Sequence, residues 1–171
     1  MKLIARIGVL ILALVLLCGC GKSNNIDVED INGDGKITCT LEIRCDTLLG
    51  NLDQLPAEKA DLVPPDGVML PVKEVEFTGG ESVFDVFRRV LRDEKIHFEY
   101  VDASAYDSVY IEGIGNLYEF DCGPQSGWMF SVNGVHPGLG CSAYTLADGD
   151  VIVFNYTLDL GSDVGAENTY E

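Results

Sequence analysis

Alternating apolar and polar positions in several short segments predict a protein built mainly from strands. The clearest example covers residues 38–45, where Cys39, Leu41 and Ile43 alternate with polar residues. The same periodicity, together with β-branched and aromatic content, predicts further strands at 72–77, 97–101, 128–132 and 151–154, and a hairpin from 108–112 and 117–120. These strands are short and separated by turn residues, as in a mostly antiparallel sheet.

One segment has the spacing of a helix instead. Its apolar positions, Val83, Val86, Phe87, Val90 and Leu91, recur every three to four residues and should face the sheet. The sequence Ser82-x-x-Asp85 resembles a capping box, so the helix is expected to begin just after Ser82. The fold class predicted from this order of elements is α+β, β-grasp-like, a mostly antiparallel sheet with one main packed helix.

The densest turn signals lie between residues 121 and 156, a stretch that holds the single tryptophan. Alternation places Trp128 and Phe130 on one face of a strand, and Asn133 opens an Asn-Gly turn after it. Two interpretations of Trp128 are open, a core residue or a platform for a flat ligand. In the second interpretation the candidate ligand-binding residues are Trp128, Phe130, Asn133 and Tyr144.

The N-terminus has the pattern of a secretory signal peptide, predicted at residues 1–19. Lys2 and Arg6 precede an apolar run at 7–17, which is much shorter than the ~20 residues that span a bilayer. The run ends in Leu17-Cys18-Gly19-Cys20, which resembles the bacterial lipobox. This resemblance implies acylation of Cys20 and anchorage at the outer face of the bacterial cell membrane. The alternative is ordinary cleavage, which would leave a soluble exported protein.

The remaining chain is predicted to form an acidic tether at 20–37, one domain at 38–161 and an acidic tail at 162–171. The net charge of −17 disfavours nucleic acid as a partner, because phosphate backbones would be repelled. It equally disfavours electrostatic docking on anionic lipid. We therefore expect membrane contact through the lipid anchor only.

The cysteines of the predicted domain are expected to form two disulfides, since an even number in an exported domain suggests bridges. Cys39 and Cys45 fall on one predicted strand, about 20 Å apart at ~3.3 Å per residue, whereas a bridge needs Cα atoms ~5.5 Å apart. Each should therefore bond one of Cys122 and Cys141, with two pairings open. A zinc site is disfavoured because no Cys-x-x-Cys occurs.

The tether contains a candidate calcium loop. Asp30, Asn32 and Asp34 stand at the first, third and fifth loop positions, and the Lys36 carbonyl at the seventh. The first six positions resemble dockerin repeats, but Leu41 occupies the twelfth position, where a bidentate carboxylate belongs. A flexible acidic linker is the alternative and the favoured interpretation.

No catalytic constellation emerges from the sequence. The serines lack a Gly-x-Ser-x-Gly elbow, and His97 and His136 have no metal-pair spacing. The cysteines are expected to be oxidised and so to supply no nucleophile. We expect the protein not to be an enzyme.

The segment from Gly127-Trp128 through the Asn-Gly turn to the Asp-Gly-Asp lead into the last strand resembles a bacterial family that groups with the C-terminal domain of transcobalamin and intrinsic factor. The resemblance covers residues 39–161 and implies a β-grasp-like fold and a cobalamin or corrinoid ligand, with delivery to an importer. In the animal proteins of this family, the domain covers one side of cobalamin and a separate helical domain holds the other side; the present sequence is too short to contain such a helical domain. Two further hypotheses are a structural or adhesive surface module without a small ligand and a calcium-binding surface protein.

Overall fold

The computed structural model describes residues 36–103 and 108–166. The strands are β1 (Ile37–Arg44), β2 (Val68–Phe77), β3 (Phe98–Ala103), β4 (Ser108–Ile114), β5 (Leu117–Tyr118), β6 (Gly127–Val132) and β7 (Val151–Thr157). The main helix is α1 (Val83–Glu94), and the 3-10 helices are η1 (Asp46–Leu48), η2 (Leu52–Gln54), η3 (Ala57–Leu62) and η5 (Ser162–Val164). The α+β prediction is confirmed.

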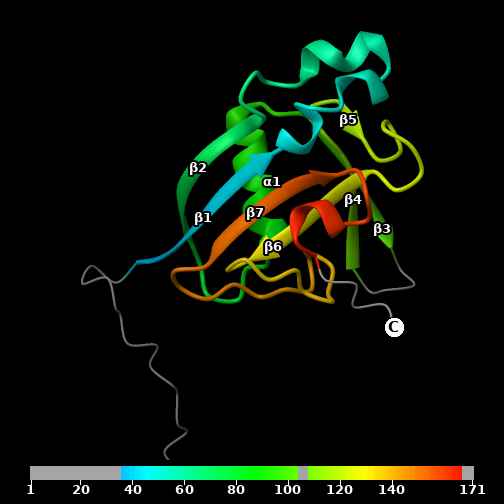
Figure 1. The fold of residues 1–171 in the computed structure, drawn as a ribbon. Helices are drawn as coiled ribbons and strands as arrows, with labels where there is room; N and C mark the ends of the chain where they lie inside the picture. Colours follow the sequence, from blue (N-terminus) through cyan, green and yellow to red (C-terminus); the bar gives the residue numbers. More distant parts are fainter. Residues whose placement is uncertain (1–35, 104–107, 167–171) are drawn as a thin grey trace, which may run out of the picture.

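The larger sheet has the strand order β2-β1-β7-β6 (Figure 1). Its two central strands, β1 and β7, run parallel, with Thr40 beside Val151 and Arg44 beside Asn155. The outer strands β2 and β6 are each antiparallel to their neighbour. The central parallel pair is flanked by two antiparallel strands, and α1 lies in the long connection from β2 to β6. This is the β-grasp arrangement that the sequence led us to expect.

Strand β2 is longer than the predicted segment 72–77 and contains Pro71. Proline cannot donate to a sheet ladder and is found at sheet edges or bulges. Here β2 is an edge strand, and its register with β1 shifts between Leu41 and Ile43, opposite Pro71. The edge position and the bulge together explain why the strand continues through the proline to Val68.

Helix α1 begins where the capping box predicts. The Ser82 hydroxyl accepts from the Asp85 backbone N–H at 3.2 Å, and the Asp85 carboxylate accepts from the Ser82 N–H at 3.0 Å. Reciprocal capping of this kind satisfies two N–H groups that the first helical turn leaves unpaired. The apolar positions predicted to face the sheet are all buried, and they are Val83, Val86, Phe87, Val90 and Leu91.

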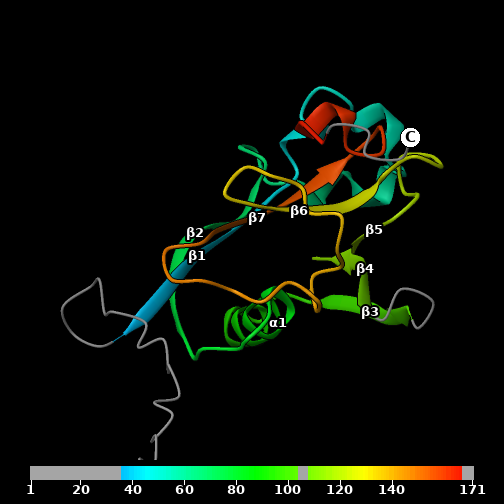
Figure 2. The same cartoon turned by 90° about the horizontal axis from the view of Figure 1, so that it is seen from below.

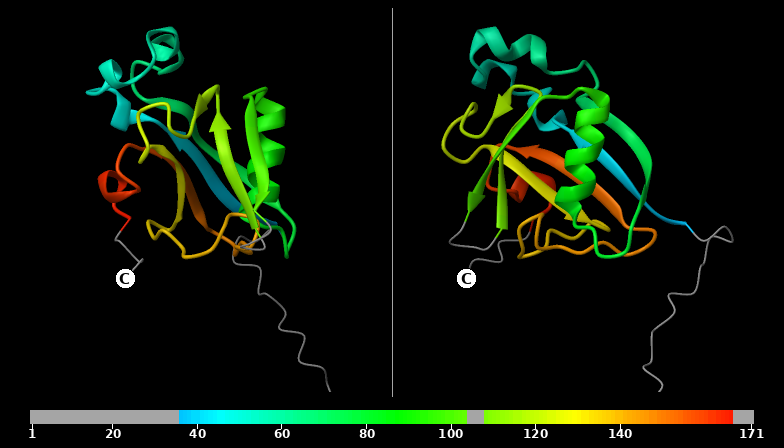
Figure 3. Two further views of the ribbon diagram at one scale, coloured as in Figure 1. Left: turned by 90° about the vertical axis from the view of Figure 1, so that its right-hand side faces the viewer. Right: turned by 180° about the vertical axis from the view of Figure 1, so that it is seen from behind.

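The smaller sheet has the order β3-β4-β5 and lies in the same layer as α1 (Figures 2 and 3). Phe84 meets Tyr100 edge-on at 4.8 Å between ring centroids, and Phe87 meets Phe98 at 5.4 Å. These contacts join α1 to β3. The hydrophobic core therefore lies between the larger sheet and a second layer of α1 and the smaller sheet.

Helix η5 extends the folded chain beyond the predicted boundary at residue 161. The Asp163 carboxylate accepts hydrogen bonds from the Thr157 hydroxyl and, at 2.8 Å, from the Leu158 N–H. The first five residues of the expected tail thus pack beside the end of β7. None of the helices within the described ranges is long and apolar enough to cross a bilayer.

Candidate functional site

A pocket of about 590 Å³ opens between β4 and β6, where the two layers separate beyond the edge of α1. We call it the β4–β6 pocket. Its walls come from β4, β6, the end of β7 and the loops around residues 120–126 and 136–143. The side chains that the argument below uses are Tyr110, Phe120, Trp128, Phe130, His136, Leu139, Cys141, Phe154 and Leu160.

Aromatic rings form the inner wall of this pocket. Phe130 on β6 stacks on Phe154 of β7, with centroids 5.7 Å apart and planes 27° apart. Phe154 in turn contacts Phe87 of α1 at 4.6 Å. Phe154 is almost fully buried, and Phe130 and Phe87 both contact it. The inner wall of the pocket is therefore part of the rigid core.

The rim exposes large apolar side chains to solvent. Tyr110, Phe120, Leu139 and Leu160 are between 41% and 60% exposed. Phe120 and Leu160 also have left-handed backbones, with φ of 66° and 48°. Such a conformation costs about 1–2 kcal/mol for a bulky residue and persists where surrounding structure enforces it. Strained, exposed apolar residues beside a pocket are typical of a binding site.

Hydrogen bonds fix the loops that carry the rim. The Ser142 hydroxyl accepts from the Val109 N–H at 2.9 Å and lies 3.0 Å from the Ser108 hydroxyl. A Cβ at Gly140 would lie 1.8 Å from Ser108 Oγ, so only glycine allows the loop to approach β4 this closely. On the opposite side, the Leu160 N–H donates to the Gln125 carbonyl at 3.0 Å.

His136 links a third part of the rim to the C-terminal segment. Its Nδ1 lies 3.0 Å from the Phe130 carbonyl and its Nε2 lies 3.2 Å from the Val164 carbonyl. The ring is thus held between β6 and η5. His136 is half-buried and lies in the wall of the pocket.

Two of the four predicted ligand-binding residues line this pocket. Trp128 is only 6% exposed, and its indole N–H donates to the Leu117 carbonyl at 2.9 Å, so it is a core residue that also contributes to the wall. Phe130 is half-buried and lies on the inner wall. Trp128 is therefore a core residue that also lines the pocket, and its role as a ligand platform stays a prediction.

Asn133 and Tyr144 are not among the lining residues. The Asn133 amide donates to Asp150 Oδ1 at 2.8 Å and accepts from the Val151 N–H at 3.0 Å, which fixes the turn between β6 and β7. The Tyr144 carbonyl accepts from the Val83 N–H at 3.0 Å, and its half-buried ring packs against the core. Both positions have structural partners.

Sequence reasoning missed the rim residues Tyr110, Phe120, Leu139 and Leu160. The usable signal was the presence of large apolar residues in segments rich in turn formers, such as Leu139 within Pro137–Gly140. Which of these residues stays exposed depends on the packing of both sheets, and no local pattern reveals it.

The disulfide prediction is not supported by the structure, in which Cys39, Cys45, Cys122 and Cys141 are all free and buried. The Cys141 thiol lies 3.8 Å from the Val109 carbonyl, to which it donates. Burial raises the pKa of Cys39 to about 11 and the pKa of Cys45 and Cys141 to about 12. These pKa values are raised because the apolar core favours the neutral thiol over the charged thiolate.

Thiol reactivity checks this correction. In a variant whose Cys18 and Cys20 are serine, a disulfide-exchange reagent such as DTNB should react slowly at pH 8, because thiolate is the nucleophile. In guanidinium chloride the same protein should release about four thiols per chain, since all four become exposed. Release of none in denaturant would restore the disulfide interpretation.

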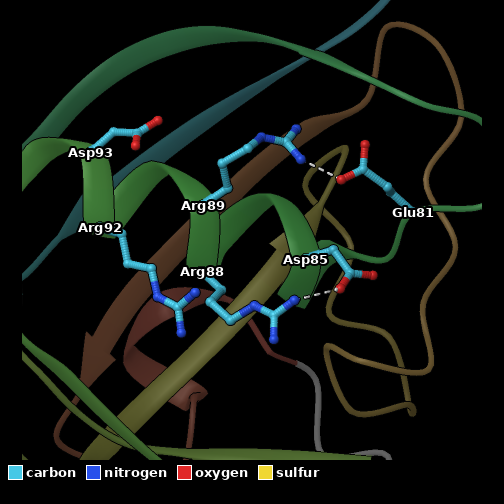
Figure 4. Close-up of a pocket in the computed structure, with 6 residues that line it drawn as sticks. All are labelled: Glu81, Asp85, Arg88, Arg89, Arg92 and Asp93. Atoms are coloured by element: carbon cyan, nitrogen blue, oxygen red, sulfur yellow. Dashed lines mark hydrogen bonds and ion pairs between the residues drawn. The ribbon is translucent and has the colours of Figure 1, made fainter.

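A second, shallower hollow lies on the outer face of α1, lined by Glu81, Asp85, Arg88, Arg89, Arg92 and Asp93 (Figure 4). Arg89 forms an ion pair with Glu81, and Arg88 lies 3.4 Å from Asp85. The Arg88 guanidinium also lies over the Phe84 ring, 5.6 Å from its centroid. Two of the three arginines are therefore paired with carboxylates on or near the same helix.

The candidate calcium residues Asp30, Asn32 and Asp34 lie outside the described residues, as does the predicted lipidation site Cys20. Lys36 is described, and its ammonium lies 2.6 Å from Glu76 Oε1. Within residues 36–103 and 108–166, no group of three or more His, Cys, Asp or Glu side chains is arranged to hold a metal ion. Calcium binding by the loop stays a prediction.

Part of the chain matches a known family model. Residues 80–157 are similar to the domain of unknown function DUF4430. The matched segment begins just before α1 and ends with β7, so it includes most residues that line the β4–β6 pocket. No curated protein is significantly similar to the chain.

Two solved structures resemble the fold. The crystal structure of haptocorrin in complex with Cbi aligns with a TM-score of 0.54 and 14% identity, over 77% of this chain and 27% of the haptocorrin chain. A candidate metal-binding protein from Ruminococcus gnavus ATCC 29149 aligns with a TM-score of 0.40 and 15% identity, over 71% of this chain and 96% of that protein. The fold implied by the transcobalamin resemblance is therefore confirmed at the level of the domain that haptocorrin contains.

Proposed function

We propose that this chain is a non-catalytic binding protein that takes a small ligand into the β4–β6 pocket. The observation that carries the proposal is a pocket of about 590 Å³ with an aromatic inner wall and an exposed apolar rim that includes two residues with strained backbones. Pockets of roughly 300–1,000 Å³ with mainly apolar walls are typical of small-molecule sites. Exposing the rim without an occupant leaves apolar area in water that a ligand would cover.

The titratable groups of the pocket support binding over catalysis. Burial, followed by the hydrogen bond to Glu119, raises the pKa of Tyr110 far above neutral pH, and burial raises the pKa of the Cys141 thiol to about 12. Both nitrogens of His136 face backbone carbonyls. A nucleophile or base must be free to react, and these three groups are neutral or already engaged.

A corrinoid is the ligand we propose to test first. The haptocorrin structure that shares this fold was solved in complex with Cbi, and the aligned region covers 27% of the haptocorrin chain. A corrinoid is larger than the β4–β6 pocket, so only part of the ligand would be enclosed by this chain. The function would then be capture at the cell surface, through an anchor at Cys20, and delivery to an importer that covers the remainder.

Titration of the protein with cobinamide and with cyanocobalamin tests this function. Intrinsic fluorescence of Trp128, corrected for absorption by the corrinoid, should decrease on binding because Trp128 contributes to the pocket wall. Ligand at 100 times Kd should stabilise the fold by about 2.7 kcal/mol, which a thermal shift would detect. Unchanged fluorescence and melting temperature at millimolar corrinoid would contradict the proposal.

A glycine substitution separates binding from folding. Phe120→Gly should weaken corrinoid binding about tenfold, because a rim ring is lost. It should leave the free energy of unfolding within about 1 kcal/mol, since glycine adopts the positive φ of residue 120 without strain. The matched control is Lys95→Gly, at φ 58° beyond the end of α1 and outside the lining, which should leave affinity unchanged.

A structural or adhesive surface module is the second candidate, and the burial of Trp128 favours it. That function requires no small ligand, so it would be adopted if neither corrinoids nor other small molecules bind. The size of the β4–β6 pocket weighs against it, because a purely structural domain should fill its core to native density.

A further inference from the structure

Among residues 36–103 and 108–166, no Lys, Arg, Asp or Glu side chain lines the β4–β6 pocket. The polar side chains that line it, apart from the exposed Gln125, are hydrogen-bonded within the protein. Ser126 donates to the Gly123 carbonyl at 2.9 Å, Ser108 lies 3.0 Å from the Ser142 hydroxyl, and Tyr110 donates to Glu119 at 2.5 Å. Within the described residues, every buried side-chain nitrogen and oxygen has a hydrogen-bond partner. The wall therefore holds no buried polar side chain that needs a ligand to satisfy it.

Two carboxylates stand directly behind lining residues. Glu119 accepts the hydrogen bond from Tyr110, and Asp163 accepts one from Thr157, which also lines the pocket. The hydroxyls of Tyr110 and Thr157 donate toward these carboxylates, so they direct their protons away from the cavity. An anion in the pocket would meet negative charge behind the wall without a free donor from either hydroxyl.

The lysine and arginine side chains of the described residues lie outside this pocket. Arg88, Arg89 and Arg92 lie on the outer face of α1, opposite the buried face that packs on the core (Figure 4). The Lys59 ammonium lies over the ring of Tyr118 in β5, 4.9 Å from its centroid, and donates to both carboxylate oxygens of Asp121 at 2.6 and 2.7 Å. No lysine or arginine of the described residues lines the cavity, and the whole chain has a net charge of −17.

We infer that the β4–β6 pocket selects apolar ligands that carry no negative charge, and that it favours a cationic ligand over an uncharged one of the same shape. This inference rests on the proposed function and specifies the ligand class of that site. Burying an anion without a paired cation carries a large desolvation cost. A cation gains from the carboxylates of Glu119 and Asp163 and from the faces of the lining aromatic rings.

Three phenoxazine dyes test the inference on the full chain: Nile red and Nile blue share one benzophenoxazine skeleton and differ in charge, and resorufin is a smaller anionic relative. Nile red is uncharged, Nile blue is cationic and resorufin is anionic at pH 7.5. Dissociation constants from fluorescence anisotropy should place Nile blue tightest and resorufin at least about tenfold weaker than Nile red. Raising the ionic strength from about 0.02 M to about 0.5 M should weaken the binding of Nile blue and leave the affinity for Nile red unchanged.

Two variants locate the effect. Glu119→Gln should reduce the preference for Nile blue over Nile red about fivefold, because it removes one carboxylate behind the wall while keeping a hydrogen-bond acceptor for Tyr110. Phe120→Gly should weaken Nile red and Nile blue alike, because it removes apolar contact from the rim. Lys95→Gly serves again as the control outside the pocket.

The possible outcomes separate the two claims. Resorufin binding as tightly as Nile red would overturn the charge selectivity while leaving the pocket as a binding site. Failure of all three dyes to bind, or binding that Phe120→Gly does not weaken, would overturn the assignment of ligand binding to this pocket. A preference for Nile blue that survives Glu119→Gln unchanged would overturn the role given to the carboxylates.

Discussion

Replacing Trp128 by alanine is expected to lower the free energy of unfolding by about 3–5 kcal/mol. The side chain is only 6% exposed, its ring meets Tyr156 edge-on at 5.2 Å, and its N–H donates to the Leu117 carbonyl. Alanine would leave a cavity between β6 and the β4–β5 hairpin, together with an unsatisfied carbonyl. Urea denaturation followed by circular dichroism measures the loss without needing the tryptophan signal.

Trp128→Phe is the matched variant, because it keeps an aromatic ring and loses only the N–H donor and part of the volume. It should cost about 1–3 kcal/mol. Val135→Ala, at a position 66% exposed, should change stability by less than about 0.5 kcal/mol. A loss below 1 kcal/mol for Trp128→Ala would show that the residue is not part of the core.

The second large effect is expected from Gly67→Ala, which should destabilise the fold by about 3 kcal/mol. Gly67 has φ of 70°, and a Cβ there would lie 2.5 Å from the Cα of Asp46. Its carbonyl also accepts from the Cys45 N–H at 2.7 Å, which closes the long connection between β1 and β2. The added methyl group would therefore push the backbone at residue 67 away from the backbone at Asp46.

Gly50→Ala provides the control for this substitution. A Cβ at Gly50 would have no neighbour within 4 Å, and the residue lies in the same connection. Its effect on the denaturation midpoint should be small, or stabilising by up to about 1 kcal/mol through the unfolded state. Equal midpoints for the two alanine variants would contradict the close approach described at Gly67.

Features set by neighbouring residues could be predicted from the sequence. The capping box of Ser82 and Asp85, the buried face of α1 and the Asn133-Gly134 turn all depend on residues within one or two turns of chain. Their chemistry fixes the conformation locally, through capping in the first case and tolerance of positive φ in the last. This is why the α+β class and the order of the elements followed from pattern alone.

Features that depend on distant segments could not be predicted. The continuation of β2 through Pro71 requires an edge position that only the assembled sheet defines. The exposure of Phe120 and Leu160 depends on how the two layers separate at β4 and β6. The amide of Asn133, expected at a ligand, instead bonds Asp150, since the register of β6 and β7 brings these residues together.

The cysteines show the same limit. Their even number favoured disulfides, yet a bridge requires two cysteines with Cα atoms about 5.5 Å apart, and the structure leaves all four free and buried. Spacing along one predicted strand disfavoured a bond between Cys39 and Cys45, but it gave no information on whether a distant partner would be positioned for bonding.

The parallel pairing of β1 with β7 has a consequence for the order in which the chain can fold. The first strand of the domain lies in the middle of the larger sheet, and its central neighbour is the last strand to leave the ribosome or to cross a membrane. Until residues 151–157 emerge, β1 can pair only with β2 and presents an open, apolar edge. Completion of the domain must therefore wait for nearly the whole chain, and a polypeptide that ends before Val151 should aggregate or be degraded.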